Sequence, residues 1–367
     1  MSEPTADLAP LAFSDLPGWA TAGHVAAVAA LRRQAVAWGD GAPKTRALGI
    51  DGDRLARIAR MAPATADEAT ARAFFEAHFT PLRVLPREGR PFLTGYFEPE
   101  LEGSRRPTER FRVPLLARPD DLVDVDAANR PASLDPSHAF ARSTPNGLVA
   151  YFDRAEIEGG ALAGRGLELV FLDDPVDAFF VHVQGSVRIR LVDGGVMRLA
   201  YAAKAGHPYT SIARELIARG VATPDAMTAD VLRAWLKAHP DEAPALMRRN
   251  RSYVFFAEQP DLDPALGAIA AAKAQLAPGV SLAVDRTLHT FGTPIFLDAD
   301  LPLGPDGALA PFRRLMIAQD TGSAILGPAR GDVFVGLGTE AGRRAGLVRH
   351  EPRAFVVLAP TATEADA

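Results

Sequence analysis

The chain of 367 residues contains no cysteine, which excludes structural disulfides, a thiolate nucleophile and every metal site with cysteine ligands. It also lacks an apolar run of about 18 residues, the length that a membrane-spanning helix needs. The first residues do not show a basic segment followed by an apolar stretch, which is the pattern of a secretory signal. The charge imbalance is small, with 40 Lys and Arg against 45 Asp and Glu, and this argues against a nucleic-acid partner.

What is present is the composition of an ordinary soluble globular protein, with 48% hydrophobic and 23% charged residues. The length allows two or three domains. The first ninety residues have a mainly helical pattern, with apolar residues at helical spacing in residues 24–38. Thr65 to Glu68 reads as a capping box that opens the next helix.

From residue 90 the pattern changes to short apolar and aromatic runs. Four such runs, separated by turn residues, lie between Leu167 and Tyr201: LELVFL, AFFVHV, SVRIRLV and VMRLAY. We expect them to be strands of a small antiparallel barrel or sandwich. Helical patterns return after Tyr209, and a second β-rich region begins at Tyr253. The sequence therefore predicts an α+β fold, mainly β, with two β modules and peripheral helices.

Three glycine-rich motifs offer competing functions. The stretch AQDTGSA, which contains Asp320, reads like the catalytic turn of an aspartic protease, but such enzymes need two of these turns and the chain has one. The spacing from Gly322 to Gly327 matches the start of a phosphate-binding loop, yet Pro and Ala follow where Lys and Ser or Thr are required. The spacing from Gly336 to Ala341 resembles a dinucleotide-binding fingerprint, but too few residues follow for the second βαβ unit.

A set of three aspartates is a stronger candidate for a site than these glycine-rich motifs: Asp285 in AVDRT, Asp320 in AQDTG and Asp332 in RGDVF. Each aspartate lies where an apolar run begins or stops, so strands can bring all three to one rim of a barrel. Taken singly, each is better explained by a structural role, such as pairing with Arg286 or capping a turn for Asp285 and a turn after Gly331 for Asp332. As a group they suit chemistry at a glycosidic bond, because burial and like charges keep one carboxyl protonated as an acid.

The segments LAVDRTLHTFGTPIFL and RLMIAQDTGSAILGPARGDVFVGLGTEAGRRAG resemble the 3D domain, named for its three aspartates, of the membrane-bound lytic murein transglycosylase A family. Upstream segments resemble the same family in order, among them TGYFEPELEGS, YFDRAEIEGGALAGRGLELVFLDDPVDAFFVHVQGS and YAAKAGHPYTSIARELIARG. The resemblance extends from about Phe92 to Leu358.

The resemblance implies a double-psi β-barrel with a second small β-barrel domain inserted in it, and glycan strands in the groove between them. The helical lead-in and first part of the main domain would cover residues 1–104. The inserted domain would cover residues 105–202, and the rest of the main domain residues 203–367, with the 3D domain at about 281–358.

The implied activity is that of a lytic exotransglycosylase, which cleaves the β-1,4 bond between N-acetylmuramic acid and N-acetylglucosamine in peptidoglycan without water. Asp332 aligns with the single catalytic acid/base, and Asp320 and Asp285 with its supporting carboxylates. The resemblance also implies motif positions that face the glycan, and the residues at these positions are Tyr96, Phe97, Gln184, Tyr201 and Tyr209. Each aromatic among them is equally expected in a core.

No cofactor or metal is implied. The expected partners are peptidoglycan glycan strands, with other cell-wall enzymes as further candidates, and the expected state is a monomer. The location implied by the substrate is the periplasm, with association to the outer membrane.

The sequence departs from the family pattern at three positions. The family has Gly at the place of Val187, Asn near Ala205 and Lys at the place of Leu326. Three alternatives remain open at this point: a non-catalytic glycan-binding barrel, an aspartic protease that acts as a dimer, and a hydrolase in which Asp332 and Asp320 activate water as a pair.

Overall fold

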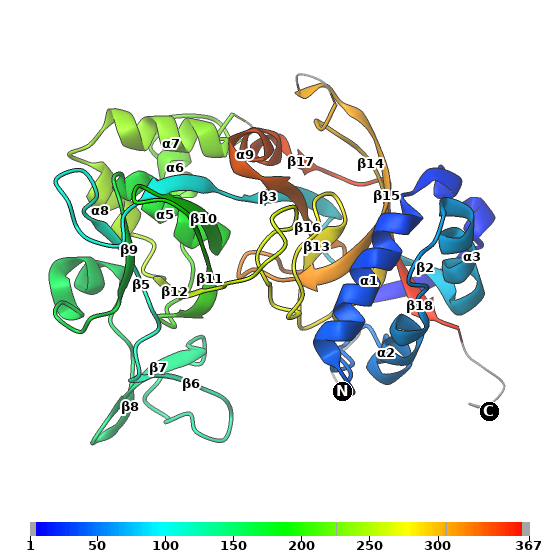
Figure 1. The fold of residues 1–367 in the computed structure, drawn as a ribbon, viewed down its shortest axis with the longest axis horizontal. Coiled ribbons are helices and arrows are strands. Elements are labelled where there is room, and N and C mark those ends of the chain that lie inside the picture. Colours follow the sequence, from blue (N-terminus) through cyan, green and yellow to red (C-terminus); the bar gives the residue numbers. More distant parts are fainter. Residues whose placement is uncertain (1–4, 225, 305–306, 362–367) are drawn as a thin grey trace. The chain divides into compact units, whose positions relative to one another are not determined.

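The computed structural model describes residues 5–224, 226–304 and 307–361, and it divides the chain into two compact units (Figure 1). Unit 2 is one continuous segment, Glu98–Asp261, whereas unit 1 is built from the chain on both sides of it, Met1–Phe97 and Leu262–Ala367. Strand accounts for 31% and helix for 27% of the structure, which confirms the predicted α+β class with more strand than helix.

Unit 1 contains a nine-stranded sheet with the order β1-β2-β18-β14-β15-β13-β16-β3-β17. Its strands are β1 (Ala6–Pro10), β2 (Phe79–Pro86), β3 (Phe92–Glu98), β13 (Ser281–Val284), β14 (Pro294–Leu301), β15 (Ala310–Asp320), β16 (Arg330–Leu337), β17 (Arg349–His350) and β18 (Ala354–Pro360). Strand β13 pairs in parallel with β15 and antiparallel with β16. The strand order shows that segments far apart in sequence, such as β3 and β16, are neighbours.

The helices of the N-terminal segment pack on this sheet and close its core. They are α1 (His24–Trp38), α2 (Gly52–Met61) and α3 (Glu68–His78), drawn in blue beside β2 and β18 in Figure 1. Leu31 of α1 and Phe75 of α3 are fully buried together with Phe296 of β14. Short helical turns at Phe13–Asp15 and Trp19–Thr21 precede α1, and α9 (Gly338–Leu347) follows β16.

Helix α1 has the predicted bounds, but the predicted capping box at Thr65 to Glu68 is wrong. Helix α3 begins at Glu68, and the carboxylate of Asp67 caps it by accepting a hydrogen bond of 2.8 Å from the backbone N of Thr70. Strands β1 and β2 also lie inside the segment that was predicted to be helical, and they pair with each other.

Unit 2 contains three smaller sheets. The largest has the order β12-β11-β10-β4, and the others are β5-β9 and β6-β7-β8. Their strands are β4 (Glu100–Gly103), β5 (Val113–Leu116), β6 (Leu122–Asp124), β7 (Phe140–Thr144), β8 (Gly147–Val149), β9 (Glu168–Leu172), β10 (Ser186–Leu191), β11 (Val196–Lys204) and β12 (Val254–Glu258). The helices are α4 (Arg154–Glu156), a π-helical segment (Ile157–Ala161), α5 (Pro175–Gln184), α6 (Ile212–Ala218), α7 (Ala229–Ala238) and α8 (Ala243–Arg248).

The run AFFVHV is not a strand, in contrast to the prediction. It lies in α5, where Asp174 caps the first turn by accepting a hydrogen bond of 2.7 Å from the backbone N of Val176. Pro175 occupies the first turn, where its missing N–H is not needed. Gly185 ends the helix in the left-handed region at φ 81°. The apolar run alone fits a strand or a helix equally well, and the capping residues at its two ends favour the helix.

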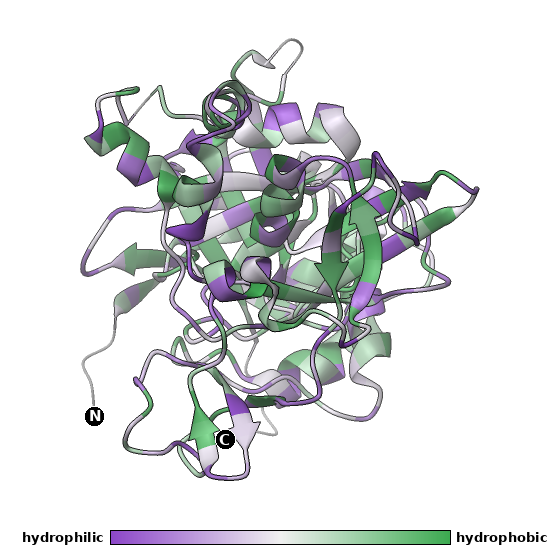
Figure 2. Cartoon of the chain, turned by 90° about the vertical axis from the view of Figure 1, so that its left-hand side faces the viewer, coloured by the Kyte–Doolittle hydropathy of each residue, from purple (hydrophilic) through white to green (hydrophobic). Residues whose placement is uncertain are grey.

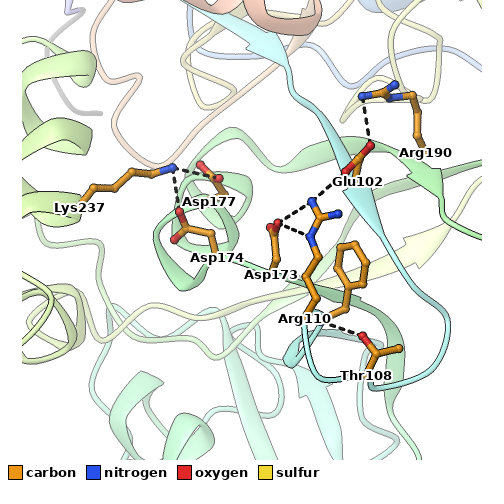
Figure 3. Close-up of polar contacts among 9 residues, drawn as sticks. Glu102, Thr108, Arg110, Asp173, Asp174, Asp177, Arg190 and Lys237 are labelled. Atoms are coloured by element: carbon orange, nitrogen blue, oxygen red, sulfur yellow. Dashed lines mark hydrogen bonds and ion pairs between the residues drawn. The ribbon is translucent and has the colours of Figure 1, made fainter.

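Ion pairs fasten the start of α5 to its surroundings within unit 2 (Figure 3). Lys237 of α7 reaches the carboxylates of Asp174 at 2.8 Å and Asp177 at 3.3 Å. Arg110 bridges Glu102 at 2.8 Å and Asp173 at 3.0 Å.

In Figure 2 several strands are green along much of their length, whereas the helices carry both colours, as helices with one buried face do.

The expected boundaries of the inserted domain, 105 and 202, both fall inside unit 2, which also holds β12 and helices α6 to α8. Among the described residues, we find no helix that combines the length and the apolar character required to span a membrane.

Candidate active site

Strand β13 places two of the three aspartates on either side of itself. Ala283 of β13 is paired with Asp320, the last residue of β15, and with Asp332, the third residue of β16. Neighbouring strands lie about 4.8 Å apart, so the two aspartates are about 10 Å apart along the sheet. The parallel and antiparallel pairings of one short strand thus bring together two carboxyls from different strands.

Asp332 is held by a side chain from another part of unit 1. The hydroxyl of Thr94 on β3 donates a hydrogen bond of 2.6 Å to Oδ1 of Asp332. The same hydroxyl accepts a hydrogen bond of 2.7 Å from Nη2 of Arg330. Burial raises the pKa of Asp332, and the charge of Arg330 and the bond from Thr94 partly oppose this effect. The result is a carboxyl that is easier to protonate than an exposed one and is fixed in orientation.

Asp320 is held by two donors of unit 1. The phenol of Tyr96 donates a hydrogen bond of 2.9 Å to its Oδ2, and the backbone N of Ala271 lies 3.4 Å from its Oδ1. Burial raises the pKa of Asp320 to about 6, hydrogen bonds from Thr321, Tyr96 and Ala271 lower it, and the charge of Asp332 raises it slightly. Tyr96 therefore contacts the second carboxyl directly, and its own ring packs against Phe334.

Asp285 has a different environment. Its Oδ1 accepts hydrogen bonds from the backbone N of Thr287 at 2.9 Å and from the hydroxyl of Thr287 at 2.6 Å. Its Oδ2 accepts a hydrogen bond of 2.9 Å from the backbone N of Gly327. This carboxylate follows β13 directly and ties the loop between β15 and β16 to the loop after β13. Its bonds fix the segment that carries the other two aspartates.

Sequence reasoning missed Thr94 and Arg330 as parts of the site. A signal for both exists in the period of a strand, since side chains two residues apart point to the same face. Thr94 precedes Tyr96 by two residues, and Arg330 precedes Asp332 by two. What the sequence does not contain is the pairing that makes β3 and β16 neighbours.

The other predicted binding residue of unit 1 is Phe97, whose ring packs on helix α9. A Cβ at Gly342 would lie 2.6 Å from Cε2 of Phe97, so the ring fits here only because residue 342 has no side chain. Gly95 lets the same strand approach α9, because a Cβ there would lie 2.9 Å from the backbone of Ala345.

The remaining predicted binding residues lie in unit 2. Gln184 ends α5, and the next residue, Gly185, accepts through its carbonyl a hydrogen bond of 2.7 Å from the backbone N of Tyr201. Gln184 and Tyr201 are thus close to each other. Tyr201 is 47% exposed and Tyr209 is 40% exposed, so each presents part of its ring to solvent.

The three departures from the family pattern lie in different environments. Val187 and Ala205 are fully buried in apolar clusters of unit 2. Leu326 is 69% exposed in the loop between Asp320 and Asp332. The lost lysine therefore affects the surface beside the candidate site, and the other two changes affect packing.

Within residues 5–224, 226–304 and 307–361, no group of three or more His, Asp and Glu side chains has an arrangement that would hold a metal ion. The candidate site consists instead of two protonatable carboxyls, their hydroxyl donors and the half-buried guanidinium of Arg330.

Comparison with known proteins matches two domains of this chain to family models. Residues 92–257 match the family model of the MltA specific insert domain, and residues 280–358 match that of the 3D domain. A crystal structure of membrane-bound lytic murein transglycosylase from Agrobacterium tumefaciens is 42% identical, with a TM-score of 0.89, and the match covers 96% of this chain and 98% of that one.

Two curated proteins named membrane-bound lytic murein transglycosylase A are also similar in sequence to this chain. The Vibrio cholerae protein is 32% identical over 274 residues, or 73% of this chain and 66% of its own length. The Escherichia coli K12 protein is 36% identical over 209 residues, or 56% of this chain and 55% of its own length. The chain thus spans between about half and two thirds of the length of these curated relatives.

The two domain matches and the arrangement of the aspartates define a 3D-domain protein that carries an MltA-type insert. The chain belongs to the membrane-bound lytic murein transglycosylase A family.

Proposed function

We propose that the protein is a lytic transglycosylase. It cleaves the β-1,4 bond between N-acetylmuramic acid and N-acetylglucosamine in peptidoglycan and leaves a 1,6-anhydromuramyl end. The names of the relatives support the reaction class, and the environment of Asp332 is the observation that carries the mechanism.

In this mechanism Asp332 acts first as an acid and then as a base. Its raised pKa favours the protonated form that donates to the glycosidic oxygen, and the resulting carboxylate then accepts the proton of the C6 hydroxyl as that oxygen closes the ring. The bond from Thr94 fixes the carboxyl in orientation through both steps. One residue is enough for both transfers because no water has to be activated.

Asp320 and Asp285 are supporting residues in this proposal. When ionised, Asp320 stabilises the positive charge that develops at the anomeric carbon. Asp285 keeps the loop before Asp332 in place through Gly327. Tyr96, Phe97, Gln184, Tyr201 and Tyr209 are proposed to contact the glycan.

A water-using hydrolase is the second candidate, because Asp320 and Asp332 flank Ala283. Their backbones lie about 10 Å apart across β13, and the two carboxyls of inverting glycosidases lie about 6.5–9.5 Å apart with a water molecule between them. Tyr96 and Ala271 occupy both oxygens of Asp320, which makes it the poorer base for a water molecule. We therefore favour the single-residue mechanism.

Mass spectrometry of fragments released from purified sacculi distinguishes the candidates. The transglycosylase releases anhydromuropeptides, each one water lighter than the reducing-end product of a hydrolase. Asp332→Asn should stop this release while the unfolding temperature stays near that of the wild type. Reducing-end products, or full activity of the variant, would overturn the proposal. Binding to sacculi without any release would indicate a glycan-binding module.

The proposal extends to the setting of the enzyme. Peptidoglycan strands are its partner, with other cell-wall enzymes as further candidates, and it acts as a monomer without a cofactor. The location that fits this substrate is the periplasm, with association to the outer membrane, as the names of the membrane-bound relatives suggest.

A further inference from the structure

A small basic hollow of unit 1 lies beside the segments that hold the candidate active site. Its volume is 160 Å³, and Lys44, Arg46 and Lys273 line it together with the rings of Trp38 and Phe291. In the part of the chain that the structure describes, these three cations form no ion pair with an acidic side chain. Three such charges around two aromatic rings suit an anionic ligand with an apolar portion.

One wall of the hollow is a tight turn attached to Asp320. The backbone N of Ala271 lies 3.4 Å from Oδ1 of Asp320, and the backbone N of Ala272 donates a hydrogen bond of 3.0 Å to the carbonyl of Gln319. The buried amide of Gln34 donates a bond of 2.7 Å to the carbonyl of Ala272. These bonds fix the turn from both sides.

Lys273 adopts a left-handed backbone conformation in this turn, with φ at 67°. Its backbone N donates a hydrogen bond of 2.9 Å to the carbonyl of Ala270, which closes the turn. A lysine in this region is strained, since glycine or asparagine is the usual residue there. Strain of this kind is concentrated at functional sites, and here it accompanies an exposed ammonium group at the rim of a hollow.

The opposite wall is attached to the loop that begins at Asp285. The backbone N of Arg46 donates a hydrogen bond of 3.1 Å to the hydroxyl of Thr290, and the backbone N of Leu48 donates one of 3.0 Å to the carbonyl of Leu288. Trp38 packs against Gly292, where a Cβ would lie 2.3 Å from the indole ring. The hollow therefore has fixed walls, and each wall is bonded to a segment that carries an aspartate of the site.

The size of the hollow limits what it can bind. Pockets that enclose a whole small ligand have volumes of roughly 300–1,000 Å³, so a hollow of 160 Å³ suits one end of a larger ligand. A second hollow borders Lys273 and adds Arg32 and Arg33, which extends the basic surface. The expected ligand is thus a chain molecule that bears more than one anionic group.

We infer that this basic hollow binds carboxylates of the peptide stems that peptidoglycan carries on its muramic acid residues. The inference rests on the proposed function, because a stem comes near Asp320 only when its glycan occupies the site. Stem peptides end in free carboxylates and contain acidic D-residues, which match the charge of the hollow. Binding a stem here would favour cleavage beside peptide-bearing muramic acid over cleavage of peptide-free glycan.

The direct test is calorimetric titration of the protein with a free stem tetrapeptide. The wild type should bind it saturably, and Lys273→Gly should weaken binding by about tenfold through the loss of one charge-assisted hydrogen bond. Glycine accepts the left-handed conformation, so this variant keeps the turn. Arg57→Ala is the matched control, because Arg57 is an exposed cation of α2 that does not line the hollow. It should bind the tetrapeptide as the wild type does.

A tetrapeptide with amidated carboxyl groups supplies the chemical control. It should not bind, and equal binding of the two peptides would overturn the inference, as would the absence of saturable binding to the wild type. The ratio of product release from peptide-bearing and peptide-free strands should also fall in Lys273→Gly. Because titration does not require catalysis, stem binding without anhydro products would overturn the proposed function alone. Anhydro products without stem binding would overturn this inference alone.

Discussion

Replacement of Thr94 by valine removes one hydroxyl from the candidate site and leaves the shape of the side chain almost unchanged. That hydroxyl donates a bond of 2.6 Å to Asp332 and accepts one of 2.7 Å from Arg330. The bond to Asp332 favours the ionised carboxylate, so its loss raises the pKa of Asp332. A hydrogen bond to a charged group is worth about 1.5–3 kcal/mol, and one pH unit corresponds to about 1.4 kcal/mol.

The alkaline limb of the pH profile of kcat/KM should therefore move upward by roughly 1 to 2 pH units in Thr94→Val. The assay is release of anhydromuropeptides from sacculi between pH 4 and pH 9, together with carbon NMR of the Asp332 carboxyl, which needs no activity. Thr94→Ser keeps the hydroxyl and should titrate like the wild type. An unmoved or lowered pKa of Asp332 in the valine variant would refute the role given to this bond.

Three further predictions concern the same unit. Burial in the folded state raises the pKa of Asp320 from 3.8 to about 6. The contribution of this group to the stability of the native state is therefore complete below about pH 3.8 and is lost as the pH rises to about 6. Between pH 4 and pH 7 the free energy of unfolding in urea should fall by roughly 2 kcal/mol more in the wild type than in Asp320→Asn, after allowance for the exposed part of the carboxyl. Equal changes of this free energy with pH in the two proteins would contradict the prediction. Gly95→Ala should reduce stability by about 1–3 kcal/mol because its Cβ would lie 2.9 Å from the backbone of Ala345; Gly159→Ala, whose Cβ meets nothing within 4 Å, should change thermal unfolding little. Leu326→Lys should leave stability within about 0.5 kcal/mol, because the side chain is exposed, and should lower KM for acidic muropeptide strands, so an unchanged KM would mean that this position does not contact the substrate.

Local sequence signals located many of the elements but did not always give their type. The bounds of α1 were predicted correctly because apolar residues recur there at helical spacing over fifteen residues. The prediction of a strand for AFFVHV was wrong because a run of six residues, five of them apolar, fits a strand or a buried helix equally well, and Asp174 and Gly185 settle the choice. Strand β1 was missed because a segment of five residues acquires its structure mainly from pairing with β2.

The family follows from the amino-acid sequence, because the aspartate motifs and the upstream segments keep their residues and order along the chain. The sequence also places Asp285 and Asp320 at the ends of strands and Asp332 near the start of one. The differences between these carboxyls, in contrast, depend on the three-dimensional fold. Thr94 lies 238 positions before Asp332, and strand pairing rather than any local pattern brings its hydroxyl to 2.6 Å from the carboxylate. The three aspartates have the same intrinsic chemistry, and their different burial and hydrogen-bond donors give one a structural environment and the other two raised pKa values.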